Sequence, residues 1–180
     1  LGPLCTEKII VTRHLKDTMP DVFRSFARVS AIAPGVLGLT GVETGEVVLG
    51  LCEKIRPDAI IAIDSLVSRK LSRLCRTIQL SDTGITPGGG IAPGRFPLDE
   101  QTLHTPVLAL GIPTVVEART LAADLCPNSP PEEELPPTSL IVTPKDIDAL
   151  MVKSAKILGY AIDMALHTHL SVEDIESLLS

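Results

Sequence analysis

A short apolar run that ends in an aspartate constrains this chain most: Ala59-Ile60-Ile61-Ala62-Ile63-Asp64. The run is continuous rather than alternating, so both faces of the strand that it predicts should be buried. Strands of this kind belong to parallel sheets that helices cover. Asp64 should then stand at the carboxyl end of the strand, the edge of an open α/β sheet where ligands bind. It is either a functional carboxylate or a helix cap, and spacing alone leaves these two interpretations about even.

Strands and helices alternate along the rest of the chain. This alternation predicts an α/β fold, a three-layer sandwich in which helices flank a mostly parallel sheet. Of the 180 residues, 44% are hydrophobic and only 2% aromatic, so aliphatic side chains must fill the core. The expected strands span residues 29–33, 59–64, 76–80 and 106–111, and the expected helices span 3–15, 43–55, 114–125, 143–166 and a short stretch after Ser171.

One Pro- and Glu-rich stretch divides the chain. Residues 127–139 read PNSPPEEELPPTS, a composition typical of an extended, solvated linker. We therefore predict an α/β core over residues 1–126, the linker at 127–139, and C-terminal helices over 140–180 that pack on the core. The long helix of this last part should begin with Thr143 as its N-cap and Pro144 in its first turn.

Charge and hydropathy exclude several classes of protein. The net charge is −6 and no Lys/Arg cluster offsets it, which argues against direct binding to nucleic acid. The sequence shows no apolar run of 18 residues and no charged-then-apolar leader, so we expect neither a membrane span nor a signal peptide. Free thiols in a reducing cytoplasm are expected for the four widely spaced cysteines, Cys5, Cys52, Cys75 and Cys126.

No residue pattern indicates a cofactor or a metal. His167 and His169 are two residues apart, a spacing that does not share a helix face. His14 and His104 have no carboxylate or cysteine at ligand spacing. The glycine-rich segments, Gly38-x-x-Gly41 and Gly88-Gly89-Gly90, match neither the dinucleotide-binding nor the P-loop pattern, so loop flexibility explains them better.

A second aspartate follows another expected strand. Right-handed crossovers would place the loops after residues 33, 64, 80 and 111 at one edge of the sheet, and so bring Asp64 and Asp82 to that edge. Two nearby carboxylates can share one proton and activate water against an amide. The simpler interpretation of Asp82 is a turn residue in Asp82-Thr83-Gly84 that bonds its own backbone.

Several longer motifs follow one another along the chain, at residues 29–36, 38–44, 57–66, 77–85, 111–116 and 142–145. Together they resemble the spore germination protease family. The likeness runs in order from Leu1 to about His167, which is far more specific than one short pattern.

This resemblance implies a function and a fold. Family members are endopeptidases that degrade small acid-soluble spore proteins during germination, in the cytoplasm of the spore core. They are made as zymogens and form homotetramers, and their fold is similar to that of the hydrogenase maturation proteases. The family is regarded as aspartic-type, so Asp64 is implied as a catalytic carboxylate, with Asp82 as an accessory candidate.

The second functional aspartate of the family lies in an Asp-Ala-Leu-Gly-Pro motif. Leu1-Gly2-Pro3 coincides with the end of that motif, so we expect the partner aspartate, and a glycine-rich strand before it, to lie upstream of Leu1. Thr86 and the Gly88–Gly90 run depart from the His-Pro-Gly-Ser-Gly of family members.

Two alternatives to the protease interpretation stay open. One is a catalytically inactive, spore-associated relative that acts as a binding or structural protein. The other is a metal-dependent maturation protease of the related fold, which the absence of an evident ligand cluster in the sequence disfavours.

Overall fold

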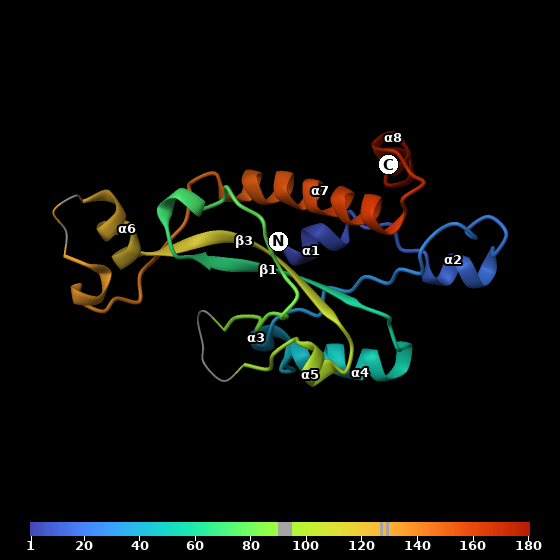
Figure 1. The fold of residues 1–180 in the computed structure, drawn as a ribbon, viewed down its shortest axis with the longest axis horizontal. Coiled ribbons are helices and arrows are strands. Elements are labelled where there is room, and N and C mark those ends of the chain that lie inside the picture. Colours follow the sequence, from blue (N-terminus) through green and yellow to red (C-terminus); the bar gives the residue numbers. More distant parts are fainter. Residues whose placement is uncertain (90–94, 127, 129) are drawn as a thin grey trace. The chain divides into compact units, whose positions relative to one another are not determined.

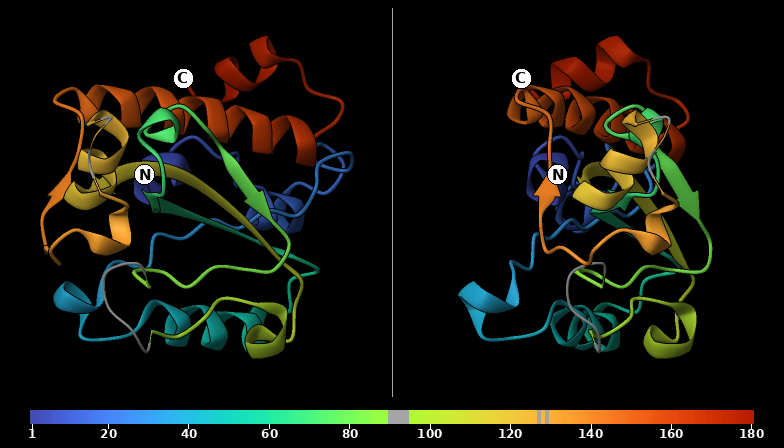
Figure 2. Two further views of the ribbon diagram at one scale, coloured as in Figure 1. Left: turned by 60° about the vertical axis from the view of Figure 1, so that its left-hand side comes forward. Right: turned by 90° about the vertical axis from the view of Figure 1, so that its left-hand side faces the viewer.

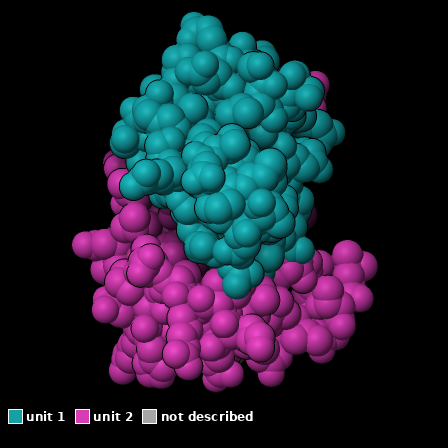
Figure 3. Space-filling model, turned by 90° about the vertical axis from the view of Figure 1, so that its right-hand side faces the viewer, with its two compact units in different colours: residues 1–33, 148–180 teal, residues 34–147 magenta. Residues whose placement is uncertain are grey.

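The computed structural model describes residues 1–89, 95–126, 128 and 130–180, and these residues form two compact units. Leu1–Ala33 with Asp148–Ser180 make unit 1, and Pro34–Ile147 make unit 2 (Figure 3). The helices of unit 1 are α1 (Gly2–Thr6), α2 (Arg13–Thr18), α7 (Ile147–Leu166, which begins at the last residue of unit 2) and α8 (Val172–Leu178) (Figure 1).

Unit 2 contains all the strands that the structure describes. Its strands are β1 (Ile60–Ser68), β2 (Gln79–Ser81), β3 (Val107–Glu117) and β4 (Ile141–Val142). Its α-helices are α3 (Leu37–Thr40), α4 (Thr44–Ile55), α5 (Glu100–Leu103) and α6 (Ala118–Leu125), and two 3-10 turns, η1 (Leu71–Arg73) and η2 (Glu132–Glu134), complete it.

The sheet is mixed, which corrects the prediction of a mostly parallel one. β1 and β3 pair in parallel from Ile60 opposite Val107 to Ser68 opposite Val116. β2 pairs antiparallel with β3, on the side away from β1, and β4 pairs antiparallel with the end of β3. Figure 2 shows β1 and β3 lying side by side. The three-layer arrangement and the likeness to hydrogenase maturation proteases stay predictions.

β3 is longer than its sequence pattern indicated. The expected strand ended at Gly111 with a helix from Thr114, but β3 continues through Pro113 to Glu117 and α6 begins at Ala118. Most residues of this continuation are buried, and among them Ile112 and Val116 place apolar side chains in the interior of the protein. Proline lacks the N–H that a ladder needs, and the register between β1 and β3 shifts just past Pro113.

Apolar residues from both strands pack with α4 and α5 on one face of the sheet. The buried cluster consists of Ala62, Leu98, Leu103 and Val107, and Val48 and Leu49 of α4 lie against it. α4 matches the predicted helix over 43–55, and Glu43 and Glu46 form a capping box at its start. This packing fixes the helices over the same face of β1 that carries Ala62.

Unit 1 is built along α7 and contains a buried carboxylate. Asp163 is fully buried, and its Oδ1 accepts a hydrogen bond of 3.1 Å from the backbone N–H of Ile10. The predicted helix over residues 3–15 is therefore wrong as one element: α1 ends at Thr6 and α2 starts at Arg13. In a continuous helix the N–H of Ile10 would donate to the carbonyl four residues back, but here it donates to the Asp163 carboxylate.

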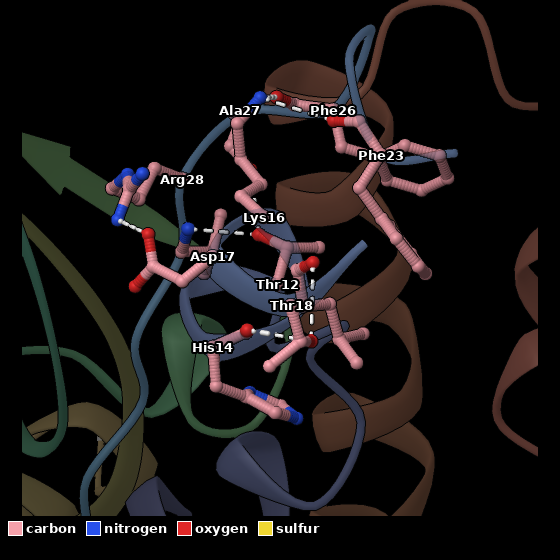
Figure 4. Close-up of polar contacts among 11 residues, drawn as sticks. Thr12, His14, Lys16, Asp17, Thr18, Phe23, Phe26, Ala27 and Arg28 are labelled. Carbon is pink, nitrogen blue, oxygen red and sulfur yellow. Dashed lines mark hydrogen bonds and ion pairs between the residues drawn. The ribbon is translucent and has the colours of Figure 1, made fainter. Parts of the chain in front are cut away.

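The loop that follows α2 is held by two polar side chains (Figure 4). The ammonium of Lys16 donates to the carbonyl oxygens of Phe23 at 3.0 Å, Arg24 at 3.3 Å and Phe26. The hydroxyl of Thr12, also fully buried, donates to the Ala27 carbonyl at 2.6 Å. Two backbone segments of unit 1 are thereby joined through side chains.

The strand predicted over residues 29–33 is not formed. The carbonyl of Val29 accepts from the backbone N–H groups of Thr12 and Arg13, and its own N–H donates to the Thr12 hydroxyl. These bonds occupy both backbone groups of Val29, so the first residue of the segment has none free for a ladder.

Of the two C-terminal helices, α7 begins later than predicted and α8 begins where the sequence indicated. α7 starts at Ile147 rather than at Thr143, because the Thr143 hydroxyl donates to the carbonyl of Thr114 at 2.9 Å and does not cap a helix. Ser171 caps α8 in a capping box with Asp174, as the sequence indicated.

The Pro- and Glu-rich stretch is only partly described. Residues 127 and 129 lie outside the described residues, and η2 occupies Glu132–Glu134. The division of the chain at 127–139 stays a prediction, while the two compact units divide after Ala33 and after Ile147. Over the described ranges, no helix combines the length and the apolar character that crossing a membrane requires.

We expect the buried Asp163 to make stability depend on pH. Burial raises the pKa of Asp163 to about 6 from its ordinary value of 3.8. The native state therefore keeps this proton at a pH where the unfolded chain has lost it, so the stabilisation is complete below pH 4 and disappears as the pH rises through 6. Two pKa units correspond to about 3 kcal/mol.

Urea denaturation between pH 4 and pH 7 tests this expectation, with Asp163→Asn as the comparison. The asparagine keeps an acceptor for Ile10 but cannot ionise, so the free energy of unfolding of the parent should fall by about 3 kcal/mol relative to the variant. A difference between the two proteins that stays constant over this pH range would contradict the expectation.

Candidate active site around Asp64

Asp64 lies in the middle of a strand, which corrects the prediction that it ends one. It is the fifth of the nine residues of β1 and stands opposite Gly111 of β3. β1 continues to Ser68 because β3 continues beside it as far as Val116. No helix follows Asp64 directly, so the helix-cap interpretation is wrong.

The side chain of Asp64 shares a face of β1 with Ala62, because successive side chains of a strand point to opposite faces. Ala62 belongs to the buried cluster under α4 and α5, so the Asp64 carboxylate stands on the helix-covered side of the sheet. The space over Gly111, opposite Asp64, is filled by Leu66: a Cβ on Gly111 would lie 2.4 Å from a methyl carbon of Leu66.

Two backbone N–H groups act on the half-buried carboxylate of Asp64. The N–H of Ser65 donates to Oδ1 at 2.7 Å. Burial raises the pKa of Asp64, and hydrogen bonding from the N–H groups of Ser65 and Gly88 opposes that rise. The carboxyl group is thus held in a fixed direction and is easier to protonate than an exposed aspartate.

Gly88 belongs to the loop between Ile85 and Leu98, and the pairing of these two residues closes the base of the loop, here called the neck. Ile85 and Leu98 exchange two backbone hydrogen bonds, of 3.0 and 2.8 Å. Gly84, at the neck, has φ +79°, and a Cβ there would lie 2.2 Å from the carbonyl oxygen of Leu98. Beyond the neck, the N–H of Gly89 donates to the Thr86 carbonyl at 3.0 Å in a turn that holds Gly88 at φ +69°.

The returning limb of the loop is fixed to the first turn of α4. Arg95 donates to Glu43 at 2.9 Å in an ion pair whose side chains are only 28% and 30% exposed. The ring of Phe96 lies directly on Gly45, where a Cβ would come within 2.0 Å of a ring carbon. Residues 90–94, which include Gly90 of the glycine run, lie outside the described residues.

Asp82 is not brought to Asp64. Because β2 is antiparallel, Ser81 stands opposite Ala109 and Asp82 continues toward the amino end of β3, away from Gly111. Three residues along the strands and two strand spacings across separate the Cα atoms of the two aspartates by about 14 Å. Asp82 is exposed, and the Ser81 hydroxyl, which accepts from the Thr83 N–H at 3.1 Å, makes the turn instead.

The loops after residues 33 and 111 were also expected at this edge, and the structure places the two segments in different settings. Pro113 and Thr114 are buried inside β3. The segment from Gly35 to Glu43 contains α3 and ends at the carboxylate that pairs with Arg95. The sequence analysis does not single out Arg95; the signal for it is an arginine between the glycine run and the apolar Leu98.

The described residues contain no group of three or more His, Cys, Asp or Glu side chains placed to hold a metal ion. His14 and His104 are exposed, whereas His167 is fully buried in unit 1, where its Nδ1 accepts a hydrogen bond from the Ala27 N–H at 3.2 Å. Cys5 and Cys52 are buried free thiols whose pKa burial raises, and Cys126 is exposed.

Comparison with known proteins gives a consistent result. A sequence profile described as germination protease matches residues 1–127. Germination proteases of Clostridium perfringens strain 13 and Clostridium tetani are 42% and 41% identical over 211 aligned residues, which cover all of this chain and 65% of each relative. That of Halalkalibacterium halodurans is 51% identical over 125 residues, 69% of this chain and 34% of the relative. The chain thus spans 65% of the length of the clostridial relatives.

We expect the neck of the loop to depend on glycine at position 84. In Gly84→Ala, both the positive φ and the contact with the Leu98 carbonyl oppose the new methyl group, at a cost of about 1–3 kcal/mol. Gly50→Ala in α4 is the matched control, because nothing lies within 4 Å of a Cβ there. Alanine inside a helix should stabilise the protein by up to about 1 kcal/mol. Urea denaturation measures both changes, and equal effects would contradict the assignment.

Proposed function

The chain belongs to the germination protease family, and on this basis we propose that it is the main part of an endopeptidase in which Asp64 is a catalytic carboxylate. The environment of Asp64 is the observation that carries the proposal. It is a half-buried carboxylate on a strand otherwise rich in apolar residues, the backbone N–H of Ser65 donates to one of its oxygens, and burial raises its pKa.

The chemistry of amide hydrolysis asks for such a group. A carboxylate that takes a proton from water generates the nucleophile, and a protonated carboxyl polarises the scissile carbonyl. Burial raises the pKa of Asp64, so the group can exchange a proton closer to neutral pH than an exposed aspartate can. The bond from the Ser65 N–H leaves one oxygen of the carboxylate for the reacting water or carbonyl.

A second carboxyl group completes the proposed mechanism. Asp82 is exposed and about 14 Å away by strand geometry, so it enters only as an accessory candidate. The partner in this proposal is instead the aspartate of the Asp-Ala-Leu-Gly-Pro motif that the resemblance to the family implies. One carboxyl then acts as base while the other supplies the proton, as in other carboxylate pairs.

The substrates in this proposal are small acid-soluble spore proteins, cleaved during germination in the spore core. Synthesis as a zymogen and assembly into a homotetramer belong to the same proposal. All of these rest on the resemblance of the sequence to the family; the name germination protease carried by the curated relatives supports a protease of germination and no more.

Replacement of Asp64 tests the function. In the full-length protein, Asp64→Asn keeps the size of the side chain and an acceptor for the Ser65 N–H but cannot take up a proton. We expect cleavage of a purified small acid-soluble spore protein to slow at least about 100-fold, the lower end of the contribution of general acid–base catalysis.

Asp82→Asn is the comparison: as an exposed accessory candidate, Asp82 should affect cleavage of the same substrate far less than Asp64 does. Densitometry of the intact substrate on gels gives the rates, and circular dichroism shows whether each variant is folded. Full activity in a folded Asp64→Asn protein would refute the role of Asp64 and favour an inactive or differently acting relative.

A further inference from the structure

We propose that His167 is an acid-sensitive latch in unit 1. Its imidazole holds the loop that follows α2, residues 19–28, while Nδ1 is unprotonated, and uptake of a proton at Nδ1 releases the loop. The latch consists of contacts within unit 1 alone, and it does not depend on the proposed role of Asp64. His167 is fully buried, one residue beyond the end of α7.

The direction of one hydrogen bond carries the proposal. The backbone N–H of Ala27 can only donate, and it donates to Nδ1 of His167 at 3.2 Å. Nδ1 must therefore be the unprotonated nitrogen of a neutral ring, in which Nε2 carries the single proton. An imidazolium has an N–H at both positions, so protonation turns two donors against each other and breaks the bond.

The neighbouring histidine does not have this sensitivity. Nε2 of His169 lies 3.2 Å from the hydroxyl of Ser25, which can donate or accept. A protonated His169 can therefore keep its bond to Ser25, whereas a protonated His167 loses its bond to Ala27. The ring of Phe26 packs against both imidazoles, with centroids 5.2 Å from His167 and 4.7 Å from His169. Release of the loop thus depends on His167 and not on the pair.

Positive charge near His167 opposes a second proton on its ring. The Lys16 ammonium of α2 binds three carbonyl oxygens of the same loop, at residues 23, 24 and 26 (Figure 4). The ring of His169 lies 6.5 Å from that of His167, centroid to centroid. Burial lowers the pKa of His167 below its usual range, the backbone of Ile10 opposes that change, and the charges of His169 and Lys16 add to it.

The carboxyl group one helical turn earlier supplies no compensating charge. The oxygens of Asp163 accept from the Ile10 N–H at 3.1 and 3.3 Å. Burial raises the pKa of Asp163 to about 6, so this group is largely protonated in acid solution. Other carboxylates of unit 1 bond elsewhere or face solvent: Asp17 bonds to Arg28 at 2.8 Å, Asp174 accepts from the Ser171 N–H at 2.9 Å, and Asp21 and Glu173 are exposed.

The consequence is a loop whose opening takes up a proton. In the open loop His167 titrates like an exposed histidine, near pH 6.5, whereas in the closed loop burial and the bond from Ala27 keep it neutral at lower pH. The open state binds more protons in this range, so its population rises as the pH falls below about 6.5. Opening also separates the Lys16 ammonium from the loop carbonyls and exposes the rings of Phe23 and Phe26.

Hydrogen–deuterium exchange of the full-length protein, followed by mass spectrometry between pH 7 and pH 5, tests the latch. After correction for the chemical exchange rate at each pH, the protection of residues 23–28 should fall by about tenfold over this range. The α7 segment around Asp163 should keep its protection, because the change is a local opening and not the unfolding of unit 1.

His167→Asn is the decisive variant. The amide oxygen of asparagine takes the place of Nδ1 as an acceptor for the Ala27 N–H, but it cannot take up a proton, so the loop should keep its protection at pH 5. His14→Asn is the matched control, because His14 is an exposed histidine of the same unit, and its loop should lose protection as the parent does.

Constant protection in the parent, or an equal loss of protection in folded His167→Asn, would overturn the proposal. If His167→Asn does not fold, nitrogen-15 NMR of the histidine rings in the parent decides the question, with variants of the other three histidines to assign the signals. Nδ1 of His167 should be unprotonated at pH 7 and should titrate below pH 6.5. A proton on Nδ1 at pH 7, or a titration at 6.5 or above, would contradict the latch.

Discussion

The parallel pairing of β1 with β3 is the constraint on which unit 2 depends. Nine residues of β1 find partners along β3, and both the buried cluster and Asp64 take their places from that register. A shift by one residue would move Ala62 out from under α4 and α5 and turn Asp64 to the opposite face. The shift of register beside Pro113 comes two to three residues beyond Asp64, so the site lies in the regular part of the pairing.

The sequence predicts the elements whose signals are local. The apolar run before Asp64 identifies β1, the stripe of α4 identifies that helix, and Ser171 with Asp174 identifies the start of α8. The failures concern partners that are distant along the chain. Nothing within residues 76–80 tells that β2 runs antiparallel, and nothing within residues 3–15 tells that Asp163 binds the Ile10 N–H.

The same distinction explains the site. Asp64 was identified because a carboxylate that ends an apolar run is visible in a short window of sequence. Its surroundings were not, because Gly88 is 24 residues away along the chain and Glu43 and Arg95 are 52 residues apart. The expectation of a mostly parallel sheet also places Asp82 at the same edge as Asp64, and the reversed direction of β2 removes it from that edge. An ion pair between residues that are far apart along the chain produces no periodic pattern in the sequence from which it could be predicted.

Lys16 shows a different way to shape a loop. Its ammonium is surrounded by three backbone carbonyl oxygens, the ligands that a bound potassium or calcium ion would also take. A tethered cation needs no supply from the medium, and a chelator cannot remove it. Its effective concentration is set by the four-carbon stem instead of by the cell. The turn from Phe23 to Phe26 therefore binds a cation that is part of the chain itself, so this site is filled without any metal ion from the medium.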